Sequence, residues 1–277
     1  MKTNFPLLRL TAFLSLVTFI SCEDDDDPVP AATVVKEWTV PLSAKFENPA
    51  PAGRAETGTA TIQLLSDNTI KYSINVAGLA ATDALTAAHI HTGDPVTNGP
   101  VVQGFDPVFS GSTATGTITN IRSSFIDSLK NDANQLYFNV HSTQVGSGLV
   151  RGQMNVGIDF AADVPLLPAN EVSTIPVVTT ATGLALLRLA TDKNLYSKVT
   201  ISNLEPTDAL KFAHIHKAAA GANGPVIIDL AANAADFGIS KVILLTDAQV
   251  TSVKTEQVYV NAHSNTWPAG IVRGQIR

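Results

Sequence analysis

The chain of 277 residues is apolar and acidic: 45% of its residues are hydrophobic, 15% are charged, and the formal net charge is -6. A chain this apolar is too hydrophobic to be intrinsically disordered. The negative balance, with no basic stripe to meet phosphates, excludes nucleic acid as a partner.

Residues 1–21 are predicted to be an export signal. Lys2 and Arg9 provide the positive end, and residues 10–20 provide an apolar core that is too short for a transmembrane helix. Cys22, the only cysteine in the chain, follows directly. Because no second thiol exists, disulfide chemistry is excluded.

The position of Cys22 resembles the signal of bacterial lipoproteins, in which the cysteine becomes the lipidated first residue of the mature protein. Phe19 departs from that pattern, which usually has leucine there. The resemblance implies attachment to the membrane through a lipid on Cys22. It implies an outer membrane lipoprotein that faces either the cell surface or the periplasm. The alternative is an ordinary signal peptide followed by a cysteine without a role.

Residues 22–33 are predicted to form an acidic tether. Glu23 and Asp24 to Asp27 are five adjacent carboxylates, which repel one another and stay solvated. The run resembles the surface-export signal of some Gram-negative lipoproteins, and it would also serve as a plain spacer. Weak calcium binding is a further reading, although a flexible run lacks a built coordination loop.

The first copy of an internal repeat is predicted to consist of short strands. Pro41 is expected to place the first strand at a sheet edge. Ser66 to Asn68 and Asn98-Gly99 are expected to be turns. A short helix is predicted at residues 124–130. The strands are predicted at residues 38–44, 58–64, 70–76, 88–91, 113–119, 135–142 and 149–156, with a further strand that begins at Pro100.

The second copy repeats this order after a predicted linker at residues 156–164, which is so short that the two copies are expected to touch. A short helix is predicted at residues 246–254, with Thr246 or Asp247 as its cap. The strands are predicted at residues 182–189, 194–201, 213–216, 241–245, 257–264 and 270–277.

These elements predict an all-β chain. The repeat is too long for a solenoid unit and indicates two duplicated domains, at residues 34–157 and 158–277. Seven or so short strands per unit, without alternation of helix and strand, favour two tandem antiparallel Greek-key β-sandwich domains, each with one short helix.

All six histidines lie in the repeated strands. Because side chains alternate along a strand, His89 and His91 are expected to share one face while Ile90 points into the core. The same parity joins groups on three strands, and if the strands are neighbours these groups converge. The groups of the first copy are His89, His91, Asn139, His141, Arg151 and Gln153. Those of the second are His214, His216, Asn261, His263, Arg273 and Gln275.

Three imidazoles per copy, two of them at i and i+2, form a candidate copper or zinc site. The arrangement resembles the copper site of Cu/Zn superoxide dismutases, where a His-x-His strand lies on a Greek-key sandwich and an arginine guides the anion. No second set of histidine and aspartate for a separate zinc site is present.

Two other interpretations of the histidines stay open. They could be struts in a structural polar network on a solvated strand face, and a nearby arginine would repel a bound cation. They could also sense pH, because imidazoles near pKa 6.5 change charge together. No Ser-His-Asp order, glycine-rich phosphate loop or pair of catalytic carboxylates is found, so no catalytic residues are predicted.

Four motifs recur in order in both copies. They are Ala-His-Ile-His (from Ala88 and Ala213), Asn-Gly-Pro-Val (from Asn98 and Asn223), Tyr-x-Asn-x-His-Ser (from Tyr137 and Tyr259) and Val-Arg-Gly-Gln (from Val150 and Val272). This order resembles the CHRD domain, the repeat named after chordin. The second copy departs at Lys217-Ala218, which replaces Thr92-Gly93, and Ser142 and Ser264 stand where the family often has threonine.

The CHRD resemblance implies an extracellular β-rich module. In animal chordin the repeats belong to a protein that binds secreted growth factors, a ligand that a bacterial lipoprotein would lack. We therefore expect a lipid-anchored cell-envelope protein whose two domains act as a non-catalytic binding module for an envelope or extracellular partner. The alternative is a copper or zinc protein with one tri-histidine site per domain, with activity like that of superoxide dismutase.

Overall fold

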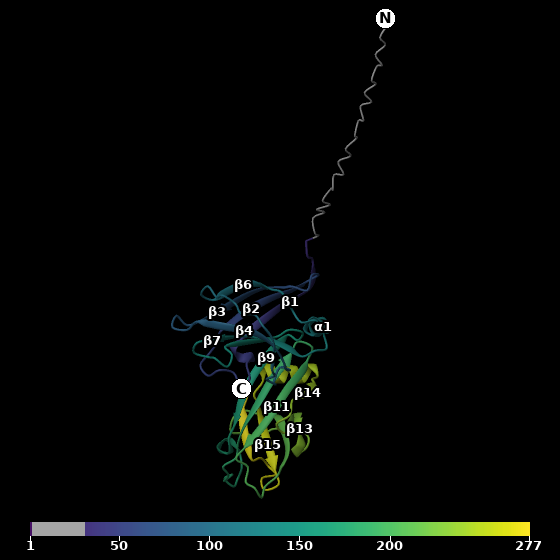
Figure 1. Cartoon of the computed structure of the whole chain (residues 1–277). Coiled ribbons are helices and arrows are strands. Elements are labelled where there is room, and N and C mark those ends of the chain that lie inside the picture. The colour runs from purple at the N-terminus through teal and green to yellow at the C-terminus, as the bar shows by residue number, and fades with distance from the viewer. Residues whose placement is uncertain (2–30) are drawn as a thin grey trace. The chain divides into compact units, whose positions relative to one another are not determined.

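The computed structural model describes residue 1 and residues 31–277. The predicted signal, Cys22 and nearly all of the acidic tether lie outside the described residues. Residues 32–277 form one compact unit that holds two tandem antiparallel β-sandwiches (Figure 1). Within the described part of the chain, no helix has the length and apolarity needed to cross a membrane.

The first sandwich contains eight strands in the order β5-β4-β7-β8-β1-β2-β3-β6 and one helix, α1 (Ser123–Lys130). Ser43 pairs with Arg151, and this single contact joins the two four-stranded layers into one continuous sheet. The strands are β1 (Val34–Ser43), β2 (Thr57–Leu65), β3 (Ile70–Ala77), β4 (Leu85–Thr92), β5 (Val101–Gly104), β6 (Thr113–Ile118), β7 (Leu136–Ser142) and β8 (Val150–Gln153).

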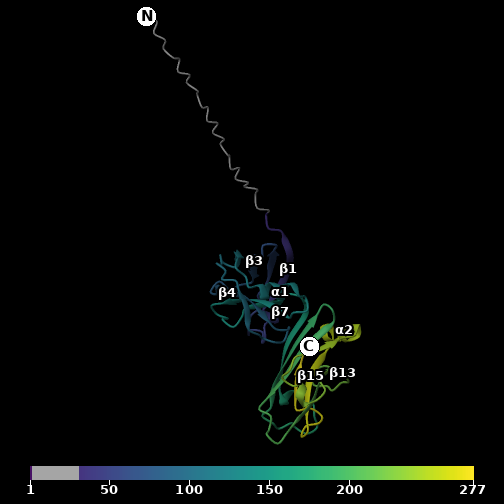
Figure 2. The same ribbon diagram turned by 45° about the vertical axis from the view of Figure 1, so that its right-hand side comes forward.

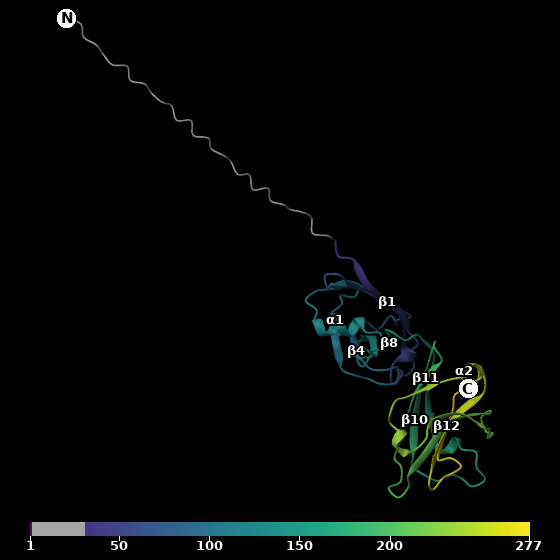
Figure 3. The same ribbon diagram turned by 90° about the vertical axis from the view of Figure 1, so that its right-hand side faces the viewer.

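The second sandwich repeats the arrangement as two separate sheets, β14-β11-β10-β9 and β13-β12-β15-β16, and its helix is α2 (Asp247–Thr255) (Figures 2 and 3). Leu167 and Arg273 form an isolated bridge where the first domain has its joining contact. The strands are β9 (Ile158–Leu166), β10 (Thr182–Ala190), β11 (Asn194–Ser202), β12 (Leu210–Lys217), β13 (Val226–Ala231), β14 (Lys241–Leu244), β15 (Val258–Ser264) and β16 (Val272–Gln275).

Alternating side chains explain why these segments form strands. Along β3, every second residue from Ile70 to Val76 is buried, and the residues between them are exposed. β2 pairs with β3 in the predicted hairpin, with Leu64 opposite Ile70. The buried sides of the two layers meet in one apolar core per domain, as expected for a sandwich.

Three details differ from the sequence-based expectations. Each domain has eight strands rather than about seven. The predicted linker at residues 156–164 is largely strand β9, which pairs along its length with β10. β1 lies between β2 and β8 instead of at an edge, but β8 pairs with it only at Ser43, so Pro41 lies in a stretch where only β2 is a paired neighbour.

The start of α2 is fixed by a capping box. Thr246 Oγ1 accepts a hydrogen bond from the Gln249 N–H, and Gln249 Oε1 accepts one from the Thr246 N–H. We expect Thr246→Ala to lower the free energy of unfolding by about 1 kcal/mol, measured by urea denaturation. Thr251→Ala, in the exposed interior of the same helix, is the control. A loss no larger than that of the control would contradict the role of the cap.

Candidate metal centre

Strand β4 carries the His-x-His motif of the first domain and lies between β5 and β7. In its register with β7, His89 is opposite Asn139, His91 is opposite Tyr137, and Ala87 is opposite His141. Ile90 points the other way and is fully buried at 0% exposure. The predicted parity of this strand is therefore confirmed. β12 and β15 repeat the register in the second domain.

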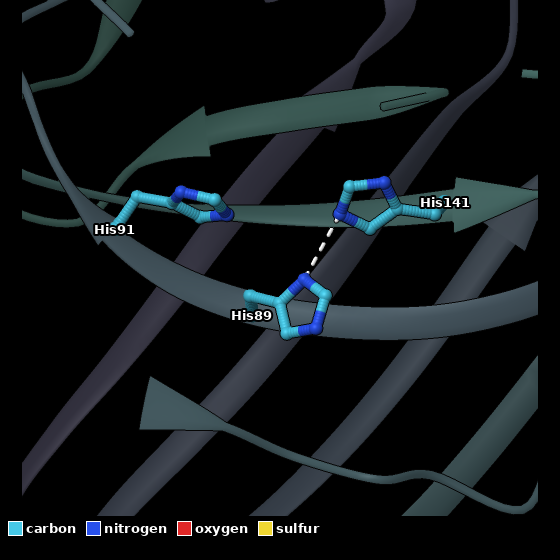
Figure 4. A group of neighbouring side chains, drawn as sticks. All are labelled: His89, His91 and His141. Carbon is cyan, nitrogen blue, oxygen red and sulfur yellow. Dashed lines mark hydrogen bonds between the residues drawn. The ribbon is translucent and has the colours of Figure 1, made fainter. Parts of the chain in front are cut away.

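The structure brings the three histidines of each domain together, and Figure 4 shows those of the first domain. In each group, one ring nitrogen per histidine lies within 4.8 Å of the others. His89 Nδ1 lies 3.0 Å from His141 Nε2, and His214 Nδ1 lies 3.2 Å from His263 Nε2. Two nitrogens on a tetrahedral zinc ion are about 3.3 Å apart when each Zn–N bond is about 2.0–2.1 Å. The spacing therefore fits a shared metal ion, although a metal role for these residues stays a prediction.

Backbone carbonyls fix the tautomers of two histidines in each domain. In the first domain, His91 donates from Nδ1 to Gly99 O and His141 donates from Nδ1 to Gly146 O, each at 3.0 Å. A carbonyl can only accept, so the proton is on Nδ1 and the lone pair is on Nε2. This hydrogen bond, made from the far ring nitrogen, is the usual partner of a metal-binding histidine.

The second domain repeats these bonds. His216 donates to Gly224 O at 2.9 Å, and His263 donates to Pro268 O at 3.1 Å. His214 Nε2 lies 3.5 Å from a carboxylate oxygen of Asp229, which favours the tautomer with the proton on Nε2 and the lone pair on Nδ1. All three imidazoles of this domain therefore have a partner on the side away from the cluster.

The Asn-Gly-Pro motif supplies the carbonyl that orients His91. A Cβ at Gly99 would lie 1.9 Å from Thr92 O, and a Cβ at Gly224 would lie 2.0 Å from Lys217 O. Only glycine lets this turn approach the end of the histidine strand so closely. The repeated glycine is thus tied to the tautomer of the repeated histidine.

Burial disfavours the charged form of five of the six imidazoles. It lowers the pKa of His89, His91, His214 and His216, and it lowers the pKa of His263 to about 4. Neutral imidazole is the form that binds copper or zinc.

A tyrosine stands between the second histidine of each His-x-His motif and the arginine that recurs in both domains. The rings of His91 and Tyr137 are stacked with centroids 4.8 Å apart, and the Arg151 guanidinium carbon lies 3.4 Å from the Tyr137 centroid. The second domain repeats this arrangement. The ring centroids of His216 and Tyr259 are 4.9 Å apart, and the Arg273 guanidinium carbon lies 3.4 Å from the Tyr259 centroid. Because β7 lies between β4 and β8, the tyrosine separates the cationic group from the imidazole.

The arginines are structural and buried. Arg151 is 1% exposed and donates to Asn98 Oδ1 at 2.9 Å, Asp94 O at 2.6 Å and Thr97 O at 3.1 Å. It also donates to Gln153, whose own amide donates to Gly93 O. Arg273, 2% exposed, holds the matching loop through Asn223, Ala219 and Ala222. A loop therefore covers the arginine-bearing face of β8 and of β16.

A comparison with protein families matches the CHRD domain model to residues 38–154 and 163–276. The chain belongs to the CHRD family. Comparisons with curated proteins and with solved structures found no match.

Sequence reasoning missed one residue at each centre. Glu47 and Glu171 each directly follow the short 3-10 helix that comes after the first strand of their CHRD domain. Burial raises the pKa of both carboxyl groups to about 7. The available signal was an acidic residue at the same place in both copies, but only the fold reveals that this place adjoins the histidine cluster.

The loop that carries Glu47 contacts the second CHRD domain. Arg188 of β10 donates to Glu47 O at 2.6 Å and to Asn48 Oδ1 at 3.0 Å, and it forms an ion pair with Asp163 at 2.7 Å. This loop lines a cleft of about 490 Å³ together with His91 and Asn139. The expected contact between the two domains is thus confirmed, and it supports one wall beside the first cluster.

A second repeated carboxylate anchors the end of the histidine-bearing strand β7. Asp83 accepts hydrogen bonds from Ser142 Oγ at 2.8 Å, Thr143 Oγ1 at 2.9 Å and the Gln144 N–H at 3.0 Å. Burial opposes its ionisation, but these bonds and Arg54 outweigh burial and hold the pKa of Asp83 well below its usual range. Asp208 does the same for Ser264 in the second domain.

We expect Asp83→Asn to lower the free energy of unfolding by about 2 kcal/mol at pH 7. Because the pKa of Asp83 is depressed in the folded state, its stabilisation is fully present above the unfolded pKa of about 3.9 and is lost as the pH falls below that value. The difference between the two proteins in urea unfolding should therefore shrink below pH 4. A difference that does not change with pH would contradict this role.

Proposed function

We propose that the chain is a lipid-anchored cell-envelope protein whose two CHRD domains are non-catalytic modules, each binding one divalent copper or zinc ion through three histidines. One observation carries the proposal. In each domain three imidazoles converge, and backbone carbonyls hold two of them in the tautomer whose free nitrogen faces the cluster. Imidazole suits both metals, so the donor set does not choose between them.

The cluster fits a metal better than it fits a closed polar network. His91 Nε2 and His216 Nε2 are buried and have no hydrogen-bond partner within residues 31–277. A structural strut would use both ring nitrogens, because a buried polar atom without a partner costs about 1–3 kcal/mol. His91 and His216 occupy equivalent positions, and each has a lone pair on Nε2 that no hydrogen bond uses. A metal ligand needs such a lone pair.

The observations favour metal binding over superoxide dismutation. An arginine that guides an anion must present free N–H groups to solvent, but Arg151 and Arg273 are buried and hydrogen-bonded to loops. The tyrosines also separate these arginines from the histidines. The arginine in the CHRD domain thus supports the fold of the site instead of recruiting substrate.

The proposed attachment of the chain to the outer membrane rests on the sequence of residues 1–33. A lipid on Cys22 with the acidic run behind it would hold the two domains away from the outer membrane, on its surface or its periplasmic side. Fractionation tests this directly. The unaltered chain should sediment with membranes, and Cys22→Ala should release it, whereas release of both or of neither would contradict lipidation at Cys22.

Metal binding is tested on the chain from residue 23 onward, purified without chelators. Titration with zinc and, separately, with copper(II) should give two ions bound per chain by elemental analysis after dialysis. The four-fold variant His91→Ala, His141→Ala, His216→Ala and His263→Ala should bind none. No retained ion at micromolar metal, or equal uptake by this variant, would contradict the proposal.

A further inference from the structure

Each domain contains a second buried hydrogen-bond acceptor near the unpartnered Nε2 atom of His91 or His216. Within the described chain, Asn139 Oδ1 and Asn261 Oδ1 are buried and have no hydrogen-bond partner, as is true of Nε2 of His91 and His216. Asn139 is 3% exposed, so its side chain has little direct contact with bulk solvent. Both domains therefore contain the same two acceptors without a hydrogen-bond partner, one amide oxygen and one imidazole nitrogen.

The asparagine lies within the group of three histidines. Asn139 is the cross-strand partner of His89 and stands two residues before His141 on the same face of β7. Its side chain also lies close enough to His91 for a hydrogen bond with that ring when the ring is protonated. Asn261 occupies the same position opposite His214. Cβ atoms of directly opposed residues lie about 4.5–5.5 Å apart, so the short amide reaches the space that the rings enclose.

The repeated glutamate orients the amide. Asn261 Nδ2 donates to both carboxylate oxygens of Glu171, at 2.9 and 3.0 Å. Both contacts are made by Nδ2, the donor atom of the amide, so Oδ1 faces away from Glu171. Glu47, which is 6% exposed, interacts with Asn139 in the first domain.

A glycine leaves room for this pair in each domain. A Cβ at Gly148 would lie 2.5 Å from Glu47 Oε1 and 3.0 Å from Asn139 Nδ2. A Cβ at Gly270 would lie 2.3 Å from Asn261 Nδ2 and 2.5 Å from Glu171 Oε2. Both glycines also have positive φ, at 135° and 150°, which other residues rarely adopt. The Glu–Asn contact is therefore built in the same way in both copies.

We infer that Asn139 and Asn261 complete the two metal sites, each providing its side-chain oxygen as a fourth ligand, and that Glu47 and Glu171 are positioning residues that turn this oxygen toward the ion. The inference rests on the proposed function. Two acceptors next to each other repel when no positive group lies between them, and a cation satisfies both. Amide oxygen is a known weak ligand of copper in sites where the other donors are stronger.

The test isolates the first site by adding His216→Ala and His263→Ala to the chain from residue 23 onward, which gives the parent. Zinc affinity is measured by competition with a chelator, and copper(II) coordination by electron paramagnetic resonance. Asn139→Leu keeps the shape of the amide but removes its oxygen. We expect it to weaken zinc binding about 10- to 100-fold and to change the copper spectrum while three nitrogen couplings remain. Asn155→Leu, a half-buried asparagine that bonds Trp38, is the control and should stay within about threefold of the parent.

A reversed pair separates a ligand from a purely structural residue. Asn139→Asp combined with Glu47→Gln keeps the shape and net charge of the pair and restores both the hydrogen bond and an oxygen facing the ion. We expect zinc affinity at least equal to that of the parent. The inference is overturned if Asn139→Leu binds zinc within threefold of the parent, or if the reversed pair binds as weakly as Asn139→Leu. If Asn139→Leu does not fold, the reversed pair alone decides. A parent that binds no zinc refutes the proposed function instead.

Discussion

Replacing His91 and His141 together with alanine is expected to halve the metal content of the chain, from two ions to one. Two of three imidazoles are then missing in the first domain, and His89 alone cannot form a structural zinc or copper site. Loss of an outer hydrogen-bond partner alone costs 10- to 100-fold in affinity, so loss of two ligands should cost more than about 100-fold. Elemental analysis after dialysis measures the loss.

The second domain provides the matched control. His216→Ala with His263→Ala should remove the other ion and leave the first in place, because the clusters are built from separate strands. Each bound ion should also stabilise its domain by about 2.7 kcal/mol when free metal is 100 times the dissociation constant. Retention of two ions by either pair of substitutions would show that the metal is held elsewhere.

Replacing Arg151 with methionine is expected to lower the free energy of unfolding by about 3–5 kcal/mol. The guanidinium is buried and donates to three groups of the loop at residues 94–98. Methionine fills part of the space but leaves these acceptors and Gln153 without their donor. Glu47 also loses the electrostatic attraction of a buried cation. Urea denaturation of the metal-free chain measures the change.

Arg122→Met is the control for the loss of an arginine. Arg122 is exposed and donates one hydrogen bond, to Val102 O. Its replacement should change the free energy of unfolding by less than about 0.5 kcal/mol. A similar small loss for Arg151→Met would contradict the view that this arginine holds the loop over the histidine-bearing sheet.

The fold class and the shared face of the histidine side chains could be predicted from the sequence. Both depend on the alternation of side chains along single strands. His89 and His91 must share a face of one strand, and the repeated His141 had to come from another. Burial was harder to foresee, since Arg151 becomes inaccessible only when residues 94–98 fold over the sheet. A polar residue on a strand does not reveal what a distant loop places on it.

The role of Glu47 and the strand β9 were missed for related reasons. Glu47 lies far from His91 in sequence, and only the packing of the two layers brings it beside Asn139. Residues 156–164 mix polar and apolar residues around Asp159 and Asp163, which suggests a linker. Their extended form comes from pairing with β10, and pairing of this kind is set by tertiary contacts more than by propensity.

Anomalous X-ray diffraction from crystals of the zinc-loaded chain would show directly whether the histidine clusters bind metal. We predict two zinc peaks per chain, each about 2.0–2.1 Å from one nitrogen of three histidines: His89, His91 and His141 in one domain and His214, His216 and His263 in the other. Peaks bound only by surface carboxylates, or no peak at either cluster, would contradict the account.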